Sequence, residues 1–221
     1  MIITAFDGSP RKNGNSRMLL NAFIAGAKEK NSDIKIYKTD EMDIKPCRGC
    51  LMCNTLKLCA IRKDNWQDIA DRIAGSDILV FSSPIYFHHT TASMKRLLDR
   101  LRSFIHVQIT VSGLIHTPHE KWNKKICLLT AHGSSAVDDA LPLVDLFKFL
   151  SEVMGPDNEF YHLNAVRLAA SGQISFDEER LRGLYKKLGI PVELAVEDAE
   201  RNAGYLKEAE NLGCSLIGRK I

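Results

Sequence analysis

The chain has 221 residues, of which 45% are apolar, and a formal net charge of +3 at pH 7. This length fits one domain, or one domain with an appendage, and the apolar share is sufficient for a core. The small charge, spread over mixed Lys, Arg, Asp and Glu, argues against a nucleic-acid footprint or a polybasic membrane patch. No window reaches about 18 apolar residues, and residues 1–30 lack the pattern of a secretion signal. We therefore expect a cytoplasmic protein whose thiols are reduced or bound to metal.

Short runs of β-branched residues alternate with amphipathic stretches along the chain. The pattern predicts strands at residues 2–6, 34–37, 78–82, 126–130 and about 159–166. It predicts helices at residues 16–30, 65–75, 91–105, 136–154, about 176–188 and 192–213. Residues 105–124 are interpreted as a long excursion that precedes the strand at 126–130. This alternation predicts an α/β fold with a parallel sheet covered on both faces.

The first predicted strand leads directly into the loop Gly8-Ser9-Pro10-Arg11-Lys12-Asn13-Gly14-Asn15-Ser16, after which a helix begins. Such a unit aims backbone N–H groups and a helix N-terminus at one point, where a phosphate binds. The loop lacks both a Walker A motif and the G-x-G-x-x-G pattern, so we expect one terminal phosphate bound without a metal ion. The alternative is an ordinary turn in which Asn15 or Ser16 caps the helix.

Two further loops follow predicted strands. Residues 82–90 contain Pro84, which fixes a turn, and Tyr86 and Phe87, whose rings can stack on an aromatic group. Residues 130–135 include small residues that permit close approach of the backbone. Because ligands of doubly wound sheets lie beyond the carboxyl ends of the strands, the three loops together predict a mononucleotide with a planar ring.

Four cysteines lie close together with the spacing C-x2-C-x2-C-x5-C, at Cys47, Cys50, Cys53 and Cys59. The first two spacings agree with the run of bacterial ferredoxins that binds a [4Fe-4S] cluster, whereas the third is longer, with five intervening residues in place of three. Zinc is an alternative, although zinc sites more often use two cysteine pairs about 15 to 20 residues apart. Redox-active or inert thiols on a loop, without a cluster, are another alternative. Cys127 and Cys214 are interpreted as small apolar residues of the core.

These motifs resemble the flavodoxin-like NAD(P)H-dependent FMN reductase superfamily and, within it, the iron-sulfur flavoproteins. The residues that carry the resemblance are GSPRKNGNS, the cysteine run, and SSPIY with the following helix that ends in MKRLLDR. It covers roughly residues 1–165. The resemblance implies a flavodoxin-like, doubly wound, five-stranded parallel sheet of order 2-1-3-4-5. It further implies an FMN-binding domain at 1–166 with a cysteine-rich loop at 43–64. Residues 167–221 have no counterpart in the family, and we expect them to form a C-terminal helical extension packed on this domain.

The resemblance also implies which residues bind FMN. The phosphate is expected at Ser9, Arg11, Asn15 and Ser16, with Lys12 as a nearby cation. The isoalloxazine ring is expected near Pro84, Ile85, Tyr86, Phe87, Ala131, His132, Gly133 and Ser134.

We therefore expect an FMN-dependent oxidoreductase or electron-transfer flavoprotein that couples FMN to a [4Fe-4S] cluster at Cys47, Cys50, Cys53 and Cys59. An NAD(P)H-dependent FMN or quinone reductase without a cluster is the alternative, and a non-catalytic redox sensor is a third hypothesis. The expected assembly is a homodimer or tetramer. A small redox protein such as ferredoxin, or NAD(P)H with a quinone-like acceptor, is the expected partner, with neither nucleic acid nor membrane. No catalytic residue is assigned.

Overall fold

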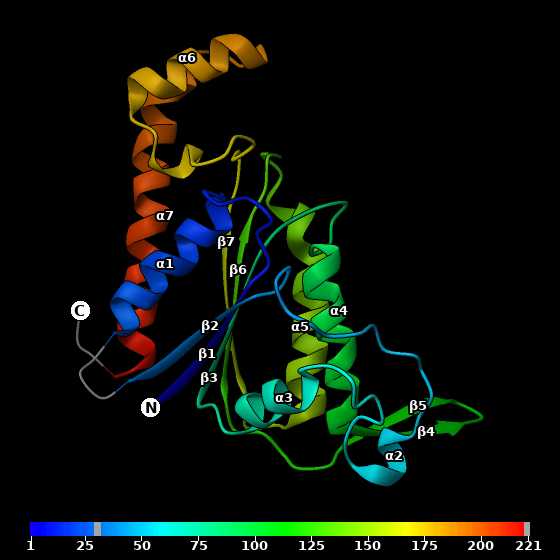
Figure 1. The fold of residues 1–221 in the computed structure, drawn as a ribbon. Coiled ribbons are helices and arrows are strands. Elements are labelled where there is room, and N and C mark those ends of the chain that lie inside the picture. Colours follow the sequence, from blue (N-terminus) through cyan, green and yellow to red (C-terminus); the bar gives the residue numbers. More distant parts are fainter. Residues whose placement is uncertain (29–31, 219–221) are drawn as a thin grey trace.

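The computed structural model describes residues 1–28 and 32–218. Its central sheet is parallel and has the order β2-β1-β3-β6-β7 (Figure 1). The strands are Ile2–Asp7 (β1), Asp33–Lys38 (β2), Ile78–Pro84 (β3), Lys125–Ala131 (β6) and Glu159–Ala165 (β7). Numbered among themselves, these five strands have the order 2-1-3-4-5, so the predicted doubly wound fold is confirmed.

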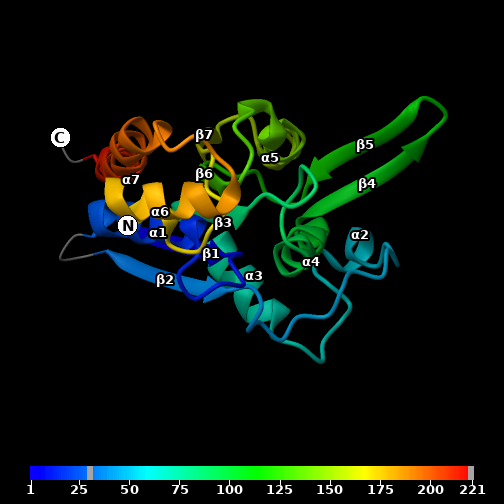
Figure 2. The ribbon, with the colours of Figure 1, turned by 90° about the horizontal axis from the view of Figure 1, so that it is seen from above.

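The central strands β1, β3 and β6 are apolar on both faces because helices cover both sides of the sheet. In β3, Ile78 and Val80 belong to one core, whereas Leu79 and Phe81 belong to the other. One face is covered by α1 (Asn15–Ala27) and α7 (Leu194–Leu216), and the opposite face by α3 (Trp66–Ala74), α4 (Ala92–Arg100) and α5 (Leu141–Met154) (Figures 1 and 2). The C-terminal helix α7 therefore completes the core on the α1 side of the sheet.

Helices α1 and α7 approach each other closely at two glycines. A Cβ atom on Gly26 would lie 1.9 Å from the carbonyl oxygen of Glu210, and one on Gly213 would lie 2.1 Å from that of Phe23. Any larger side chain would push the two helices apart. Helix α6 (Glu178–Leu188) then packs on the first turns of α7 through Leu181 and Tyr185. No helix in the described part of the chain is long and apolar enough to cross a membrane.

Residues 105–124, which we interpreted as a long excursion, include regular structure. They contain an antiparallel hairpin of β4 (Ile105–Thr110) and β5 (Gly113–Pro118), which projects from the body of the molecule (Figure 2). Several of its apolar side chains, including Ile109, Val111 and Leu114, are exposed. The residues of β4 nevertheless alternate, with Ile105 and Val107 buried and His106 and Gln108 exposed, whereas β5 is largely exposed and shows no such pattern.

Two helix boundaries and one short helix also differ from the prediction. Helix α4 ends at Arg100, and a 3-10 turn at Leu101–Phe104 leads into the hairpin. The helix predicted from residue 136 begins as a 3-10 turn at Val137–Ala140, after which α5 starts. Helix α2 (Cys53–Leu56), within the cysteine run, is a single turn that is too short to leave a periodic pattern. A further 3-10 turn occupies Gln173–Ser175.

Candidate functional site

The three loops predicted to share a ligand meet at the carboxyl ends of β1, β3 and β6. They enclose a pocket of about 90 Å³, the strand-end pocket, together with residues that follow β7. Its lining is formed by Ser9, Arg11, Gly14, Asn15, Ser16, Pro84, Ile85, Tyr86, Ala131, His132, Gly133, Leu168 and Ala169. The structure thus brings together all the predicted FMN-binding residues except Lys12, Phe87 and Ser134.

The N-terminus of α1 forms one end of the strand-end pocket. Its first turn has no side-chain cap and no acidic residue, so its leading N–H groups are available to an anion. The hydroxyl of Ser16 is buried and has no hydrogen-bond partner. A buried polar group without a partner is costly, and a phosphate oxygen would satisfy it. The residues at this end therefore fit a terminal phosphate.

Gly14 leaves space at the end of the strand-end pocket that fits a phosphate. A Cβ atom at this position would lie 1.9 Å from the Ser9 hydroxyl oxygen, so only glycine allows the loop to fold back on itself. The Ser9 hydroxyl in turn makes a 3.3 Å contact with the backbone N–H of Arg11.

Asp7 and Arg17 hold in place the loop of residues 8–14, which we call the phosphate loop. Asp7 is buried, accepts a hydrogen bond from the Ser9 N–H at 2.9 Å, and pairs with the Arg17 guanidinium. Arg17 also donates to the carbonyl of Ser9 at 2.9 Å and to that of Lys12 at 3.2 Å. Sequence reasoning missed Arg17, although a carboxylate at the end of a buried strand signals that a cationic partner is needed.

The Asn15 side chain is committed to another segment of the chain. Its Nδ2 donates to the carbonyls of Leu168 and Ala170 at 3.2 and 2.9 Å, and its Oδ1 accepts from the Ile174 N–H at 3.1 Å. Arg11 adds a hydrogen bond of 3.0 Å from Nη1 to the Ala169 carbonyl. Asn15 therefore has its backbone N–H, and not its amide, available to a ligand.

Residues 168–174, which we call the wall segment, supply a side of the strand-end pocket that the sequence did not predict. Leu168 and Ala169 line the pocket directly. The segment follows the last strand of the sheet and lies beyond the region that carries the family resemblance, so no motif pointed to it.

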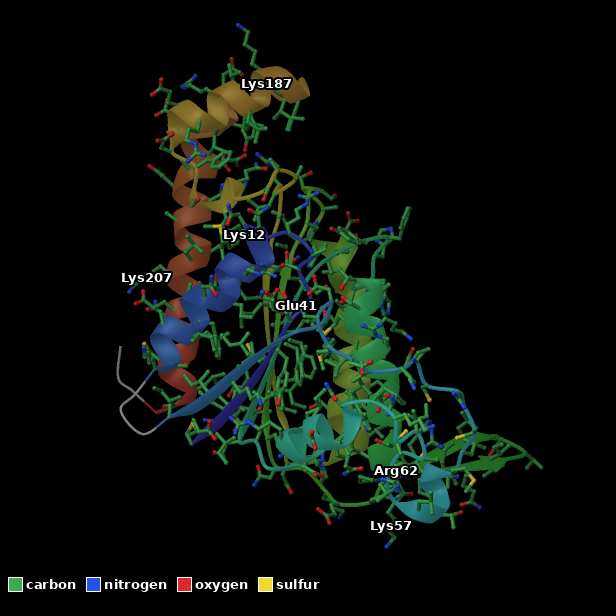
Figure 3. All side chains as sticks on the ribbon, viewed as in Figure 1. Lys12, Glu41, Lys57, Arg62, Lys187 and Lys207 are labelled. Atoms are coloured by element: carbon green, nitrogen blue, oxygen red, sulfur yellow. The ribbon has the colours of Figure 1, made fainter. Side chains whose placement is uncertain are left out.

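The three predicted residues that do not reach the pocket each have a physical reason. Lys12 is exposed at the outer end of its loop (Figure 3). Ser134 accepts a hydrogen bond from the Ala136 N–H at 3.1 Å with its hydroxyl oxygen. Phe87 is fully exposed and stands at the tip of a tight turn.

That turn is strained at the edge of the strand-end pocket. Tyr86 and His89 exchange backbone hydrogen bonds of 2.8 and 3.0 Å across it. Both residues at the tip, Phe87 and His88, have positive φ values, 50° and 60°. Two-residue turns of this kind normally use Asn-Gly, because side chains crowd the left-handed conformation. Strain of this type is often retained at binding sites.

His132 is a buried titratable residue in the lining of the strand-end pocket. It is 5% exposed, and neither ring nitrogen has a hydrogen-bond partner. Burial lowers its pKa, and Asp139 and Asn164 oppose this effect more weakly. The ring is therefore neutral near pH 7 and can donate or accept one hydrogen bond.

The four clustered cysteines line one small space of about 30 Å³, which we call the cysteine hollow. Cys53 is buried, Cys47 and Cys59 are partly buried, and Cys50 is exposed. Burial raises the pKa of Cys53, and the cation of Arg102 opposes this, with Nη1 3.4 Å from the sulfur. In residues 1–28 and 32–218, no three Cys, His, Asp or Glu side chains are arranged so that they could hold a metal ion. The four predicted ligands therefore line one space, but their side chains do not have the arrangement of a metal site.

The surroundings of the cysteine hollow suit an anionic group. Arg48, Arg100 and Arg102 line it. Gly49 and Leu51 both have left-handed backbone conformations, with φ of 64° and 56°. Left-handed residues beside right-handed ones turn successive N–H groups inward, as in many anion and iron-sulfur sites. The donor set and its charge therefore fit a thiolate-bound cluster.

A buried ion pair fixes the two ends of the cysteine run. The side chains of Arg100 and Asp64 are fully buried and lie 2.5 Å apart. Asp64 accepts from the Lys45 N–H at 2.8 Å, and Arg100 donates to the Lys45 carbonyl at 2.7 Å. Burial alone would raise the pKa of Asp64, but hydrogen bonds from Arg100 and the backbone lower it overall.

The strand-end pocket and the cysteine hollow lie at opposite ends of one helix. Pro84 to Tyr86 precede α4, whereas Arg102, which contacts Cys53, follows it. Figure 1 shows the loops after β1 and β3 at one end of α4 and helix α2 at the other. With the following 3-10 turn, α4 is about 20 Å long at a helical rise of about 1.5 Å per residue.

Known proteins are similar to this chain in sequence and in fold. An iron-sulfur flavoprotein of Clostridioides difficile is 36% identical over 102 residues, which cover 45% of each chain. One of Methanosarcina thermophila is 29% identical over 100 residues, which cover 45% of this chain and 52% of the relative. The alignments thus span about half the length of these curated relatives.

Solved structures agree in fold. The azoreductase AzrA superposes with a TM-score of 0.62 at 15% identity, covering 97% of this chain and 100% of the other. An NAD(P)H:quinone oxidoreductase from Methanothermobacter marburgensis superposes with a TM-score of 0.57 at 15% identity, covering 100% and 97%. Residues 1–160 match the model of a family described as NADPH-dependent FMN reductase. Since this match covers most of the chain, including the phosphate loop and the cysteine run, the chain belongs to the NADPH-dependent FMN reductase family.

Proposed function

We propose that the protein is an FMN-dependent oxidoreductase that couples FMN in the strand-end pocket to a [4Fe-4S] cluster in the cysteine hollow. The observation that carries the flavin assignment is the uncapped N-terminus of α1, where the Ser16 hydroxyl is buried without a partner. FMN brings one terminal phosphate and one planar ring, which the phosphate loop and residues 84–86 suit respectively.

The residues of the strand-end pocket have distinct parts in this proposal. The N–H groups at the start of α1, Ser16 and Arg11 bind the phosphate, while Pro84 and Tyr86 orient the ring. Neutral His132 offers one hydrogen bond beside the ring and carries no charge there. FMN supplies two-electron chemistry and a cluster supplies one-electron chemistry, so together they would connect hydride donors to single-electron carriers.

The cluster assignment is supported by the cysteine hollow. Its thiols share one space, three arginines line it, and the curated relatives are named iron-sulfur flavoproteins. A cluster held by four thiolates is anionic, and Arg48 and Arg102 would offset this charge, since Arg100 is already paired with Asp64. Cys47, Cys50, Cys53 and Cys59 are the proposed ligands.

The separation of the two sites along α4 points to an assembly of several protomers. Electron transfer weakens steeply with distance, and the length of α4 separates the two sites within one protomer. We therefore propose a homodimer or tetramer in which the cysteine hollow of one protomer faces the strand-end pocket of its partner. The projecting hairpin carries exposed Ile109, Val111 and Leu114, and exposed apolar groups of this kind mark contact surfaces. A monomeric mass by light scattering would contradict the assembly.

The cluster and the flavin are tested together by anaerobic purification. The visible spectrum, iron, acid-labile sulfide and FMN are measured for the parent protein and for Cys50→Ser. The expected result is iron and sulfide in the parent, their loss in Cys50→Ser, and FMN in both. Cys214→Ser is the matched control, because Cys214 packs against α1 with its sulfur 3.3 Å from the Gly26 carbonyl.

An NAD(P)H-dependent FMN or quinone reductase without a cluster is the second candidate. It is favoured by the observation that the described thiols are not arranged around a metal site. FMN without iron or sulfide, together with NADPH oxidation by a quinone in the parent and Cys50→Ser alike, would establish this function and reject the cluster.

A further inference from the structure

Arg102 connects the cysteine run to the hairpin. Its Nη1 atom donates to the Ile105 carbonyl at 2.6 Å and to the Cys53 sulfur at 3.4 Å. Its Nη2 atom donates to the side-chain oxygen of Asn54 at 3.0 Å. Nη1 carries two hydrogens, so it can serve both of its acceptors. Because the guanidinium is planar, the contacts with Ile105 and Asn54 also fix the direction of the N–H group that points at the Cys53 sulfur.

The side chain of Asn54 holds Arg102 in this position. Its Nδ2 atom donates to the Val107 carbonyl at 2.8 Å, and its Oδ1 atom accepts from the Val107 N–H at 3.0 Å. Asn54 therefore pairs with β4 much as the backbone of a neighbouring strand would. Because Cys53 and Asn54 are adjacent on α2, this pairing also fixes the Cys53 sulfur relative to Arg102.

Two carboxylates near the cysteine hollow have cationic partners of their own. Asp99 and Arg102 line one open surface groove, but Asp99 pairs with Lys95 at 2.5 Å. Asp64 pairs with Arg100, and both side chains are fully buried. Arg102 is itself partly buried, so water screens its charge less than that of an exposed arginine. Its charge therefore remains available to the cysteine.

The protonation state of Cys53 decides which hydrogen bond it makes with Arg102. As a thiol, Cys53 donates to the Arg102 carbonyl, which lies 3.7 Å from the sulfur. As a thiolate it has no hydrogen to donate and can only accept, which it does from the guanidinium. Hydrogen bonds to the sulfur ligands are among the factors that set the reduction potential of an iron-sulfur centre.

We propose that Arg102 is a positioning residue that raises the reduction potential of the centre held by the four cysteines, through its hydrogen bond to Cys53. Asn54 holds Arg102 in place for this role. The inference rests on the proposed function, because it concerns the cluster assigned there. One-electron reduction adds one negative charge to that centre, and a cationic donor fixed at a sulfur ligand favours the more negative state.

Redox titration of the anaerobic protein, loaded with FMN and iron, tests this role. Dithionite supplies the electrons, the low-temperature EPR signal follows the reduced cluster, and absorbance follows FMN. Arg102→Gln should lower the midpoint potential of the cluster by about 59 mV, which is a tenfold loss in its one-electron reduction constant. The midpoint potential of FMN should not change. Arg62→Gln is the matched control, because it removes an exposed cation of the loop at 43–64, and it should leave both potentials unchanged.

Two further variants separate the hydrogen bond from charge and from folding. Arg102→Lys keeps the charge but cannot make the same three contacts, so it should also lower the cluster potential. It carries the comparison if Arg102→Gln retains no iron. Asn54→Ala should lower the potential as well, but should add little to the effect of Arg102→Gln, because Asn54 acts through Arg102.

Equal cluster potentials in the parent, Arg102→Gln and Arg102→Lys would overturn the proposal, and so would an equal fall in Arg62→Gln. Additive effects of Asn54→Ala and Arg102→Gln would reject the positioning part of Asn54. A parent protein without iron and sulfide rejects the proposed function and this inference with it. A loaded cluster whose potential is the same in the parent and the Arg102 variants rejects this inference alone.

Discussion

Arg167 and Asp198 form an ion pair that connects the C-terminal helices to the strand-end pocket. The Arg167 Nη1 atom lies 3.0 and 3.1 Å from the two carboxylate oxygens of Asp198, which is fully buried on α7. Tyr185 also donates to Asp198, and burial together with this hydrogen bond raises the pKa of Tyr185 to about 12. Arg167 has a positive φ of 58°, and its carbonyl accepts from Gln173 Nε2 at 2.8 Å. The pair thus holds the wall segment, which begins at the next residue.

Replacement of Asp198 should therefore loosen the strand-end pocket. Asp198→Asn removes the charge that Arg167 and Arg201 share, and the loss of a buried pair costs about 3 kcal/mol of unfolding free energy. The FMN Kd should rise as well, as measured by flavin fluorescence. Glu210→Gln, at an exposed pair on the same helix, should change neither quantity. An unchanged FMN Kd in folded Asp198→Asn would show that the pair serves stability alone.

The Ser16 hydroxyl should contribute to phosphate binding and to nothing else. Ser16→Ala removes a group without a partner in the protein, so the free energy of unfolding should not fall. The Kd for FMN should rise about tenfold, because a hydrogen bond to a charged group contributes about 1.5 kcal/mol or more. The Kd for riboflavin, which lacks the phosphate, should not change. Ser215→Ala, at an exposed position of α7, is the control. Equal effects on FMN and riboflavin would contradict the phosphate assignment.

The Asp64–Arg100 pair should be needed for loading the cysteine hollow. Asp64→Asn leaves the buried Arg100 without its counter-charge and releases Lys45, so the ends of the cysteine run lose their anchor. Iron and sulfide per protein should fall while the FMN content is retained. Asp99→Asn, next to Arg100 but in an exposed pair with Lys95, should keep both contents at the parent level. Full iron loading in Asp64→Asn would reject the anchoring role.

His162 should make the protein less stable as the pH falls. Burial, with Lys148 and His132 nearby, lowers its pKa from 6.5 to about 4. The folded protein therefore binds fewer protons than the unfolded chain between these values. The contribution of His162 to the free energy of unfolding is fully present above pH 6.5. It declines as the pH falls toward 4, by about 2 kcal/mol after allowance for partial exposure of the ring.

Denaturant unfolding at pH 7.5 and pH 4.5 measures this effect. His162→Gln should reduce the difference in unfolding free energy between the two pH values. His106→Gln, at an exposed position on the hairpin, should preserve it. The same pH difference in the parent and in His162→Gln would assign it to other groups.

The sequence by itself determined the sheet and the meeting of three loops. Runs such as Ile78–Phe81 are apolar on both faces, which together with the alternating helical stretches indicates covered parallel strands. Once the strands are parallel, their carboxyl ends lie at one edge, so Ser9, Pro84 and His132 must come together. Local patterns sufficed because each strand, turn and helix start carries its own signal.

Only the tertiary structure decided the features that depend on distant partners. The commitment of Asn15 to residues 168–174 and the burial of Asp198 against Arg167 join segments far apart in the chain. The hairpin at 105–118 was missed because only β4 alternates between buried and exposed residues, whereas the apolar groups of β5 are exposed. The spacing of the four cysteines predicts a metal centre, whereas the position of the cysteine run at the far end of α4 follows from packing. Side-chain type and spacing are local properties, whereas distance between sites is set by the whole fold.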